Sequence, residues 1–274
     1  MLSIAGSDSG GGAGIQADLK AFARCGVHGM TAITALTAQN TVGVTGIHGV
    51  PGDFIVEQVR AVAEDIGIDA VKIGMLGTAD TVRAVREAVG LLAPGTPVVL
   101  DPVMVSESGA VLLDEEARAA IVAELLPVVT VITPNLPEAR VLARRDDSDE
   151  DVEQLARTLH ELGPQVVVVT GGHRAAATDM FFDGDALVAI PGERYPDGAA
   201  HGSGCTHSSA LAAHLALGYG PLEAARAARQ IAGEAVRNGI RGLGAGPGPV
   251  DVFALSERPR AALGGARAGT GPLP

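Results

Sequence analysis

Short apolar runs rich in β-branched residues alternate with amphipathic segments along most of the chain, and this alternation predicts strands and helices in turn. The predicted strands are Leu2–Ala5, Met30–Ala35, Val44–Val50, Ala70–Ile73, Val98–Asp101, Val129–Thr133, Val166–Thr170, Asp179–Phe182 and Leu187–Ile190. Apolar positions three to four residues apart predict helices at Phe54–Ile66, Thr81–Leu92, Glu115–Leu125, Asp151–Leu162, Cys205–Leu217 and Pro221–Asn238, with another near Ile15–Ala23.

The character of these runs predicts the fold class. VVL (98–100) and QVVVV (165–169) are continuously apolar, as in strands buried on both faces of a parallel sheet that is flanked by helices. MFFDGDALVAI (180–190) predicts a hairpin at one edge of the sheet. We therefore expect a three-layer α/β fold with a mostly parallel central sheet.

Local signals bound the helices and the domain. Thr78 with Asp80, and Ser148 with Asp151 three residues later, are plausible capping residues for two of the helices. No internal repeat is present, so we expect one domain over residues 1–255. Residues 256–274 are rich in Gly, Ala, Pro and Arg without periodicity, and this composition predicts a disordered tail.

Composition narrows the function classes. A hydrophobic content of 47% with 19% charged residues describes a globular protein, and the net charge of −12 disfavours nucleic acid and anionic membranes as partners. The chain has no basic leader and no apolar run long enough to cross a bilayer, so we expect a cytoplasmic location. Two cysteines provide no disulfide framework. A small-molecule substrate fits these properties best.

The polar residues of interest follow predicted strands. Gly6–Asp8, Asp101, Asn135 and Gly171 each come after or at the end of one. Ligands of open α/β sheets bind beyond the carboxyl ends of the strands. We therefore expect these residues to converge on one site.

The stretch AGSDSGGGAGIQAD (5–18) resembles a phosphate loop, because it follows a strand and opens a helix. It matches neither the GxxxxGK[ST] pattern nor GxGxxG. Its amides could hold a ligand, and Asp8 or Asp18 could bond to that ligand. A flexible turn between strand and helix is the alternative interpretation.

HGSGC (201–205) makes a stronger case for anion binding. Gly202 and Gly204 allow the backbone around Ser203 to turn and to direct N–H groups at one point, where the helix adds unpaired donors and its positive dipole end. The pattern predicts an anion hole for phosphate or for charge that develops in a transition state.

Cys205 lies on the first turn of that predicted helix, where a thiol is expected to have a lowered pKa. A dyad with His207 is unfavourable, because residues two apart on a helix point away from each other. Metal ligation lacks partners at a suitable spacing. Cys205 could also be a buried side chain that only packs in the interior, but we favour a role as a base or as electrostatic support at the anion hole.

Two further pairs offer ligand chemistry. Asn135 and Glu138, in ITPNLPEA, are oxygen donors three residues apart that could share a hydrated Mg²⁺, although Glu138 could equally serve the helix dipole. Asp101 ends another strand, where a carboxylate needs a partner or a metal. Gln39 and Met75 follow or end strands and offer an amide and a soft apolar side chain.

Eight motifs, in order and at their usual spacing, give the chain a family resemblance from Leu2 to about Phe253. They are SIAGSDSGGGAGIQADLK, TALTAQNT, VKIGML, VLDPVM, ITPNLPEA, VTGGH, HGSGC and GPGPVDVF. In these the chain resembles the hydroxymethylpyrimidine and phosphomethylpyrimidine kinases of thiamine biosynthesis, a branch of the ribokinase-like superfamily. The resemblance implies a ribokinase-like fold and transfer of the γ-phosphate of ATP, with Mg²⁺, to hydroxymethylpyrimidine and then to its monophosphate.

The resemblance also implies roles for individual residues. Catalysis would involve Cys205 in the anion hole of Gly202, Ser203 and Gly204, where many relatives place an aspartate base. The pyrimidine would contact Gln39, Met75, Gly6, Ala13 and Asp18. ATP would contact Thr170, Gly172 and Asp101, and Asn135 and Glu138 would order Mg²⁺. The family further implies a homodimer.

The chain departs from the family pattern at two positions. Glu107 and Thr170 stand where the family frequently has lysine, so two cations are missing near the expected reaction centre. A pyridoxal or pyridoxamine kinase of the same branch is the nearest alternative, because it shares the cysteine loop. A pyrimidine-binding regulator without catalysis comes next, and a thiol hydrolase using Cys205 is third.

Overall fold

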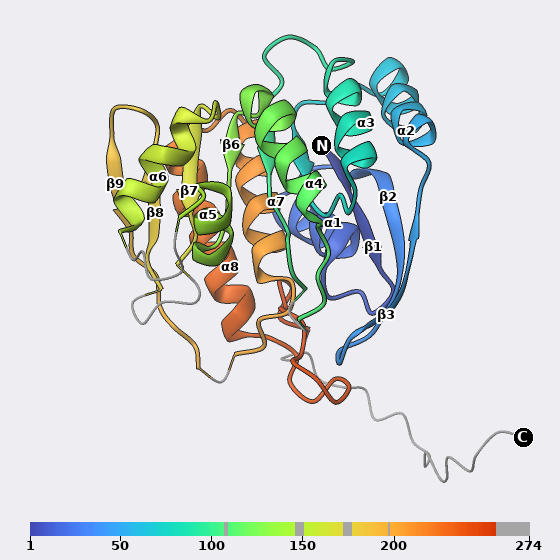
Figure 1. The fold of residues 1–274 in the computed structure, drawn as a ribbon. Helices are drawn as coiled ribbons and strands as arrows, with labels where there is room; N and C mark the ends of the chain where they lie inside the picture. Colours follow the sequence, from blue (N-terminus) through green and yellow to red (C-terminus); the bar gives the residue numbers. More distant parts are fainter. Residues whose placement is uncertain (107–108, 146–150, 172–176, 197, 256–274) are drawn as a thin grey trace, which may run out of the picture.

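A nine-stranded sheet forms the centre of the molecule in the computed structural model, which describes residues 1–106, 109–145, 151–171, 177–196 and 198–255. The strand order is β3-β2-β1-β4-β5-β6-β7-β8-β9. The six adjacent strands β2, β1, β4, β5, β6 and β7 run parallel to one another. At one edge β3 runs antiparallel to β2, and at the other β8 runs antiparallel to both β7 and β9. The predicted fold class is therefore confirmed, including the edge hairpin (Figure 1).

The strands are β1 Leu2–Asp8, β2 Met30–Gln39, β3 Val44–Gly49, β4 Val71–Ile73, β5 Val98–Leu100, β6 Val131–Ile132, β7 Val166–Val169, β8 Asp179–Phe182 and β9 Leu187–Ile190. The α-helices are α1 Gly14–Arg24, α2 Gly52–Asp65, α3 Ala79–Val89, α4 Glu115–Ala120, α5 Leu136–Leu142, α6 Val152–Glu161, α7 Ser203–Ala216 and α8 Pro221–Arg237.

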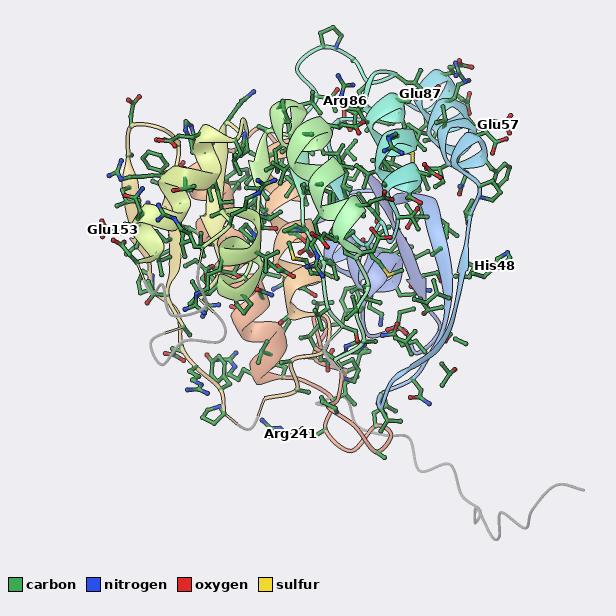
Figure 2. The ribbon with its side chains drawn as sticks, in the orientation of Figure 1. His48, Glu57, Arg86, Glu87, Glu153 and Arg241 are labelled. Carbon is green, nitrogen blue, oxygen red and sulfur yellow. The ribbon has the colours of Figure 1, made fainter. Side chains whose placement is uncertain are left out.

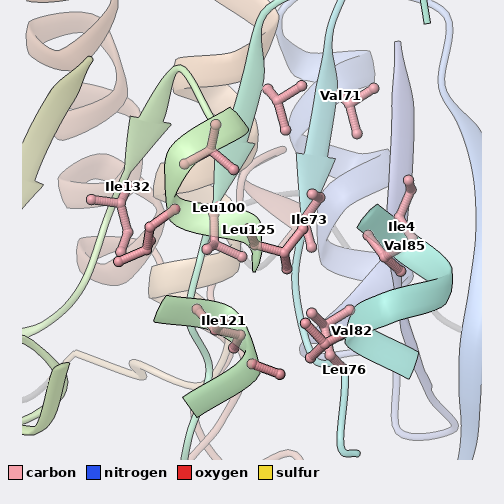
Figure 3. Close-up of a cluster of buried hydrophobic side chains, with 14 of the residues drawn as sticks. Ile4, Val71, Ile73, Leu76, Val82, Val85, Leu100, Ile121, Leu125 and Ile132 are labelled. Carbon is pink, nitrogen blue, oxygen red and sulfur yellow. The ribbon is translucent and has the colours of Figure 1, made fainter. Parts of the chain in front are cut away.

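Helices cover both faces of the sheet and give the fold two hydrophobic cores. Helices α2, α3, α4, α5 and α6 pack on one face, over a cluster that includes Ile73, Leu100 and Leu125 (Figure 3). Helices α1, α7 and α8 cover the other face, where Phe22 and Val168 are buried among the alanines of α7 and α8. Small alanine side chains let these two helices approach each other and the sheet closely.

Charged side chains on the outer faces of the helices point away from these cores. Figure 2 shows Glu57, Glu87 and Glu153 extending outward from their helices, and all three are exposed. No helix in the described part of the chain is long and apolar enough to cross a membrane.

The main departures from the predicted elements lie at their ends. The predicted helix Glu115–Leu125 keeps its α-helical form only to Ala120, and continues as a π-helical turn (Ile121–Leu125) and a 3₁₀ turn (Leu126–Val128). Pro127 explains the change, because it has no N–H to continue the α-helical ladder.

The predicted caps are partly right. Thr78 accepts the N–H of Thr81 and caps α3 as predicted. For α6 the prediction was wrong, because Asp151 itself accepts the N–H of Gln154 at 3.0 Å and caps the helix. Ser148, the predicted cap, lies outside the described residues.

Candidate active site

A cavity of about 400 Å³ lies beyond the carboxyl ends of the parallel strands, between the two helix layers. It contains most of the residues that the sequence singled out. Those in its lining are Gly6, Ala13, Gln39, Met75, Asp101, Asn135, Glu138, Thr170, Gly202, Ser203, Gly204 and Cys205. Segments from both halves of the chain therefore meet at one site, as the strand-end rule predicts.

Two described residues that the sequence placed at the site, Asp18 and Gly171, are absent from this lining. Gly172 lies outside the described residues. Asp18 is fully buried in α1, where its carboxylate accepts from Ser3, Lys72 and Ser209. The expectation that Asp18 contacts the substrate is therefore wrong, because its oxygens face the protein interior.

The loop at residues 8–14, here called the acceptor loop, is shaped by Asp8. This carboxylate accepts the N–H groups of Gly10 at 2.8 Å and of Gly12 and Ala13 at 2.9 Å. These three amides are therefore directed at Asp8, and not at a ligand as the sequence suggested. Burial works against the charge of Asp8, but His201 and the loop N–H groups outweigh it and lower the pKa of the carboxyl.

Residues 200–205, here called the anion loop, lead into helix α7. Gly202 adopts φ +85°, and a Cβ at this position would lie 1.8 Å from the carbonyl oxygen of Gly12. Only glycine satisfies both conditions. The first turn of α7, with Gly204 and Cys205, carries the unpaired N–H groups and positive dipole end of a 14-residue helix into the cavity lining.

Cys205 is half-buried and lines the cavity. Burial raises the pKa of its thiol to about 12, and the carboxylates of Asp101 and Asp18 add to this, while the charge of Lys72 and an N–H from Gly14 oppose it. The expectation of a lowered pKa is therefore wrong. The helix terminus is only one contribution, and burial beside two carboxylates outweighs it.

Lys72, on strand β4, is the most important residue that the sequence analysis left out of the site. Its side chain is fully buried, with Nζ 2.9 Å from Asp18 Oδ1 and 4.0 Å from Asp101 Oδ2. Burial alone would lower its pKa, but Asp18, Cys205 and Asp101 together raise it, so the ammonium is charged. A signal existed, since Lys72 is one of two lysines and interrupts an apolar strand.

The residues that could hold a metal gather at the start of α5. Asn135 and Glu138 form a capping box: Asn135 Oδ1 accepts the Glu138 N–H and Glu138 Oε2 accepts the Asn135 N–H, both at 2.9 Å. Burial and the neighbouring charge of Asp101 raise the pKa of Glu138 to about 8. The pair therefore caps helix α5, a local structural role related to the helix-dipole role that was the alternative for Glu138.

These oxygen donors also fit a divalent cation. A cation would offset the mutual repulsion of Glu138 and Asp101, and Mg²⁺ characteristically takes one or two carboxylates and completes its shell with water and phosphate oxygens. Among the described residues no three His, Cys, Asp or Glu side chains form a protein-only metal cage.

The far end of the cavity, beside β7 and α8, contains cations that the sequence analysis did not single out. Gly171 donates its N–H to Asp179 Oδ1 at 2.8 Å, and Arg229 approaches the same oxygen at 3.9 Å. His207 Nε2 lies 3.2 Å from Asp179 Oδ2, so its partner is this aspartate and not Cys205. Arg194 and Arg229 both line the cavity. Their helical and loop positions give no local pattern that would have marked them.

An anion loop at a helix start, a metal-compatible pair and a polar pocket now share one cavity in a ribokinase-like α/β fold. This combination defines the class of small-molecule kinases. The chain belongs to the phosphomethylpyrimidine kinase family, whose model matches residues 8–251.

Individual relatives agree with this assignment. The hydroxymethylpyrimidine/phosphomethylpyrimidine kinases of Rhizobium meliloti and Streptomyces coelicolor are 46% and 44% identical, over 92% and 94% of this chain and 96% of each relative. The solved pyridoxal kinase of Bacillus subtilis, in an ADP complex, is 37% identical with a TM-score of 0.84, covering 94% of this chain and 98% of that one. A Clostridium difficile phosphomethylpyrimidine kinase structure is 39% identical with a TM-score of 0.73, covering 84% and 95%.

Proposed function

We propose that this protein transfers the γ-phosphate of ATP to hydroxymethylpyrimidine and then to the resulting monophosphate, as a step of thiamine biosynthesis. One observation carries the proposal. Gln39 and Met75, which suit a small ring, line the same cavity as the anion loop and the Asn135–Glu138 pair. The acceptor and the phosphates can therefore meet within one cavity.

The acceptor ring would lie at the β1–β2 end of the cavity. Gln39 ends β2, and its Oε1 accepts from Thr37 Oγ1 at 3.2 Å, which leaves its amide N–H₂ as the donor toward a ring nitrogen. Met75 Sδ would be 3.4 Å from a Cβ placed on Gly6. The thioether and this glycine thus form a close apolar wall suited to the face of a flat ring.

Phosphoryl transfer would take place at the anion loop. The acceptor hydroxyl oxygen attacks the γ-phosphorus, the bond from phosphorus to the bridging oxygen of ADP breaks, and the hydroxyl proton passes to a base or to water. The neutral Cys205 thiol would support the transferring charge from the N-terminus of α7. To accept the hydroxyl proton itself, Cys205 would first have to lose its own proton to water and act as the thiolate. The N–H groups of the first turn would stabilise negative charge on the phosphoryl oxygens.

Mg²⁺ would be ordered by Asn135 and Glu138, with Asp101 nearby, and would neutralise charge on the phosphate oxygens. ATP would extend from there toward Thr170 and the end of β7. Arg194 and Arg229 provide positive charge in this part of the cavity, where Thr170 provides none. The proposal also carries over from the family a cytoplasmic location and a homodimer. Size-exclusion chromatography with light scattering tests the homodimer.

Pyridoxal phosphorylation is the second candidate. Its support is the similarity to solved pyridoxal kinases, one of them from Staphylococcus aureus in complex with pyridoxal, at 33% identity and a TM-score of 0.83. Pyridoxal also carries a hydroxymethyl group on a flat six-membered ring. The higher identity of the pyrimidine kinases over nearly the whole chain ranks this candidate second.

The test is an acceptor-dependent transfer assay with γ-labelled ATP. Purified protein should label hydroxymethylpyrimidine when Mg²⁺ is present, and chelation with EDTA should abolish transfer. The Cys205→Ala variant serves as the control for a contaminating kinase, because its rate should fall while its melting temperature is retained. Label transfer that is unaffected by this substitution would contradict the proposal.

A further inference from the structure

The acceptor loop and the anion loop contact each other directly, although nearly 200 residues separate them. The Gly12 carbonyl lies against Gly202, where a Cβ would come within 1.8 Å of the oxygen. Gly14 of the acceptor loop and Cys205 of the anion loop both line the cavity. The loop expected to hold the acceptor and the loop expected to hold the transferred phosphate therefore pack against each other without an intervening element.

A buried side-chain contact joins the same two loops. His201 Nε2 lies 3.1 Å from Asp8 Oδ2, with the histidine side chain 11% exposed and the aspartate 3% exposed. Asp8 Oδ2 is also the oxygen that accepts the N–H groups of Gly12 and Ala13. The atom that shapes the acceptor loop is therefore the atom that the imidazole holds.

The fit between the ring and the acceptor loop is close. A Cβ on Gly12 would lie 2.2 Å from His201 Cδ2 and 2.8 Å from its Nε2. The imidazole thus occupies the space that a side chain at position 12 would need. Any side chain at residue 12 would displace the ring from Asp8.

The backbone of His201 has a separate anchor. Its carbonyl accepts the N–H of Val250 at 3.0 Å, and its own N–H approaches the Gly248 carbonyl at 3.4 Å. These bonds fix the anion loop to the segment around Pro249 whatever side chain residue 201 carries. The imidazole is therefore free to act on the acceptor loop, and its loss leaves the backbone of the anion loop in place.

We propose that His201 is a positioning residue, whose bond to Asp8 sets the distance between the acceptor hydroxyl and the anion hole. This inference rests on the proposed kinase function and adds a residue to it. Productive transfer requires the attacking oxygen within about 3–3.5 Å of phosphorus, and a misplacement of about 1 Å can cost on the order of 100-fold in rate. The acceptor loop is held through one carboxylate oxygen of Asp8, so loss of the bond to His201 can shift the loop by a distance of that order.

The experiment separates the hydrogen bond from the shape of the side chain. His201→Leu fills a similar volume without an N–H, and His201→Gln restores an N–H group at a similar reach. His214→Leu and His214→Gln are the matched controls: His214 lies on α7, the helix that follows the anion loop, and its Nδ1 is 2.8 Å from the Ala210 carbonyl, away from the cavity lining. For each variant kcat, both KM values and the melting temperature are measured.

We expect His201→Leu to lower kcat by about 10- to 100-fold while both KM values stay within about twofold. His201→Gln should recover most of kcat, and neither His214 variant should change it. In an Asp8→Asn background, the further loss caused by His201→Leu should largely disappear, because the partner is already altered.

Three results would overturn the inference. They are a wild-type kcat in His201→Leu, a raised pyrimidine KM at unchanged kcat (which would make His201 a ligand contact), and equal losses in the Leu and Gln variants. If His201→Leu does not fold, Gly12→Ala displaces the ring from the opposite side and should reproduce the kcat loss. A wild-type protein that transfers no phosphate would contradict the proposed function itself, whereas an active wild type with an unaffected His201→Leu contradicts only the positioning role.

Discussion

Lys72 Nζ lies 2.9 Å from Asp18 Oδ1, and solvent reaches neither side chain. The pair joins strand β4 to helix α1, and Asp18 also accepts from Ser209 of α7 at 2.8 Å. Helix α1 follows the acceptor loop and α7 follows the anion loop. One buried ion pair thus fixes the two helices that position both parts of the site.

Removal of one partner should leave the other as an uncompensated buried charge. We expect Lys72→Met to lower the free energy of unfolding by about 3–5 kcal/mol, measured by urea denaturation. Asp18→Asn added to Lys72→Met should recover part of this loss, since it neutralises the stranded carboxylate. Lys20→Met is the matched control: Lys20 is exposed and donates to the Gly11 carbonyl, so its loss should cost less than about 1 kcal/mol. Equal stability of the two single Lys→Met variants would contradict the account.

Substitution of Cys205 should affect turnover more than binding. We expect Cys205→Ala to lower kcat by about 100-fold or more with little change in either KM, as for the loss of a group that acts in the transition state. Cys205→Asp should retain activity if the residue accepts the proton. Small and equal losses in both variants would limit the thiol to packing.

The protonation state of Cys205 can be measured through its reactivity. The ordinary pKa of the thiol is 9.0 and burial raises it to about 12, so well below pH 9 the thiolate should be on the order of 1,000-fold scarcer than in a free cysteine. In a Cys25→Ser background, iodoacetamide should label Cys205 very slowly at pH 7 and faster with each step up to pH 10. Fast labelling that levels off near pH 7 would show a lowered pKa instead.

The same thiol affects stability at alkaline pH. Because its pKa is higher in the folded than in the unfolded chain, its contribution to stability is complete below pH 9 and is lost as the pH rises from 9 toward 12. Cys205→Ser should therefore flatten the decline of the unfolding free energy between pH 8 and 10. An identical decline in both proteins would contradict the assigned direction.

The two functions of Glu138 can be separated by one substitution. Glutamine also completes a capping box, so Glu138→Gln should keep the melting temperature close to that of the wild type while raising the Mg²⁺ concentration needed for half-maximal activity. Glu138→Ala should also lose the bond from the Asn135 N–H, which costs about 0.5–1.5 kcal/mol of stability, while Asn135 still accepts the backbone N–H of residue 138. An unchanged Mg²⁺ dependence in Glu138→Gln would contradict the metal-binding role and limit Glu138 to helix capping.

The sequence predicted what depends on local pattern. Apolar runs located all nine strands, and the strand-end rule correctly placed Gly6, Asp101 and Asn135 at one cavity. Local patterns could not predict the side-chain pairs that organise this cavity. Lys72–Asp18 and His201–Asp8 are 54 and 193 residues apart in the sequence, so neither pair produces a local periodicity. The prediction of a lowered pKa for Cys205 was wrong for a related reason: a local helix-terminus argument could not include the carboxylates of Asp18 on α1 and of Asp101, which follows β5.

The most direct test of the central claim is a mass-resolved product assay with Mg-ATP, in which hydroxymethylpyrimidine, its monophosphate and pyridoxal compete for the purified protein. The account predicts the pyrimidine diphosphate as the final product, with the monophosphate appearing first. Pyridoxal phosphate as the dominant product, or no phosphorylated pyrimidine from an intact, folded protein, would contradict it.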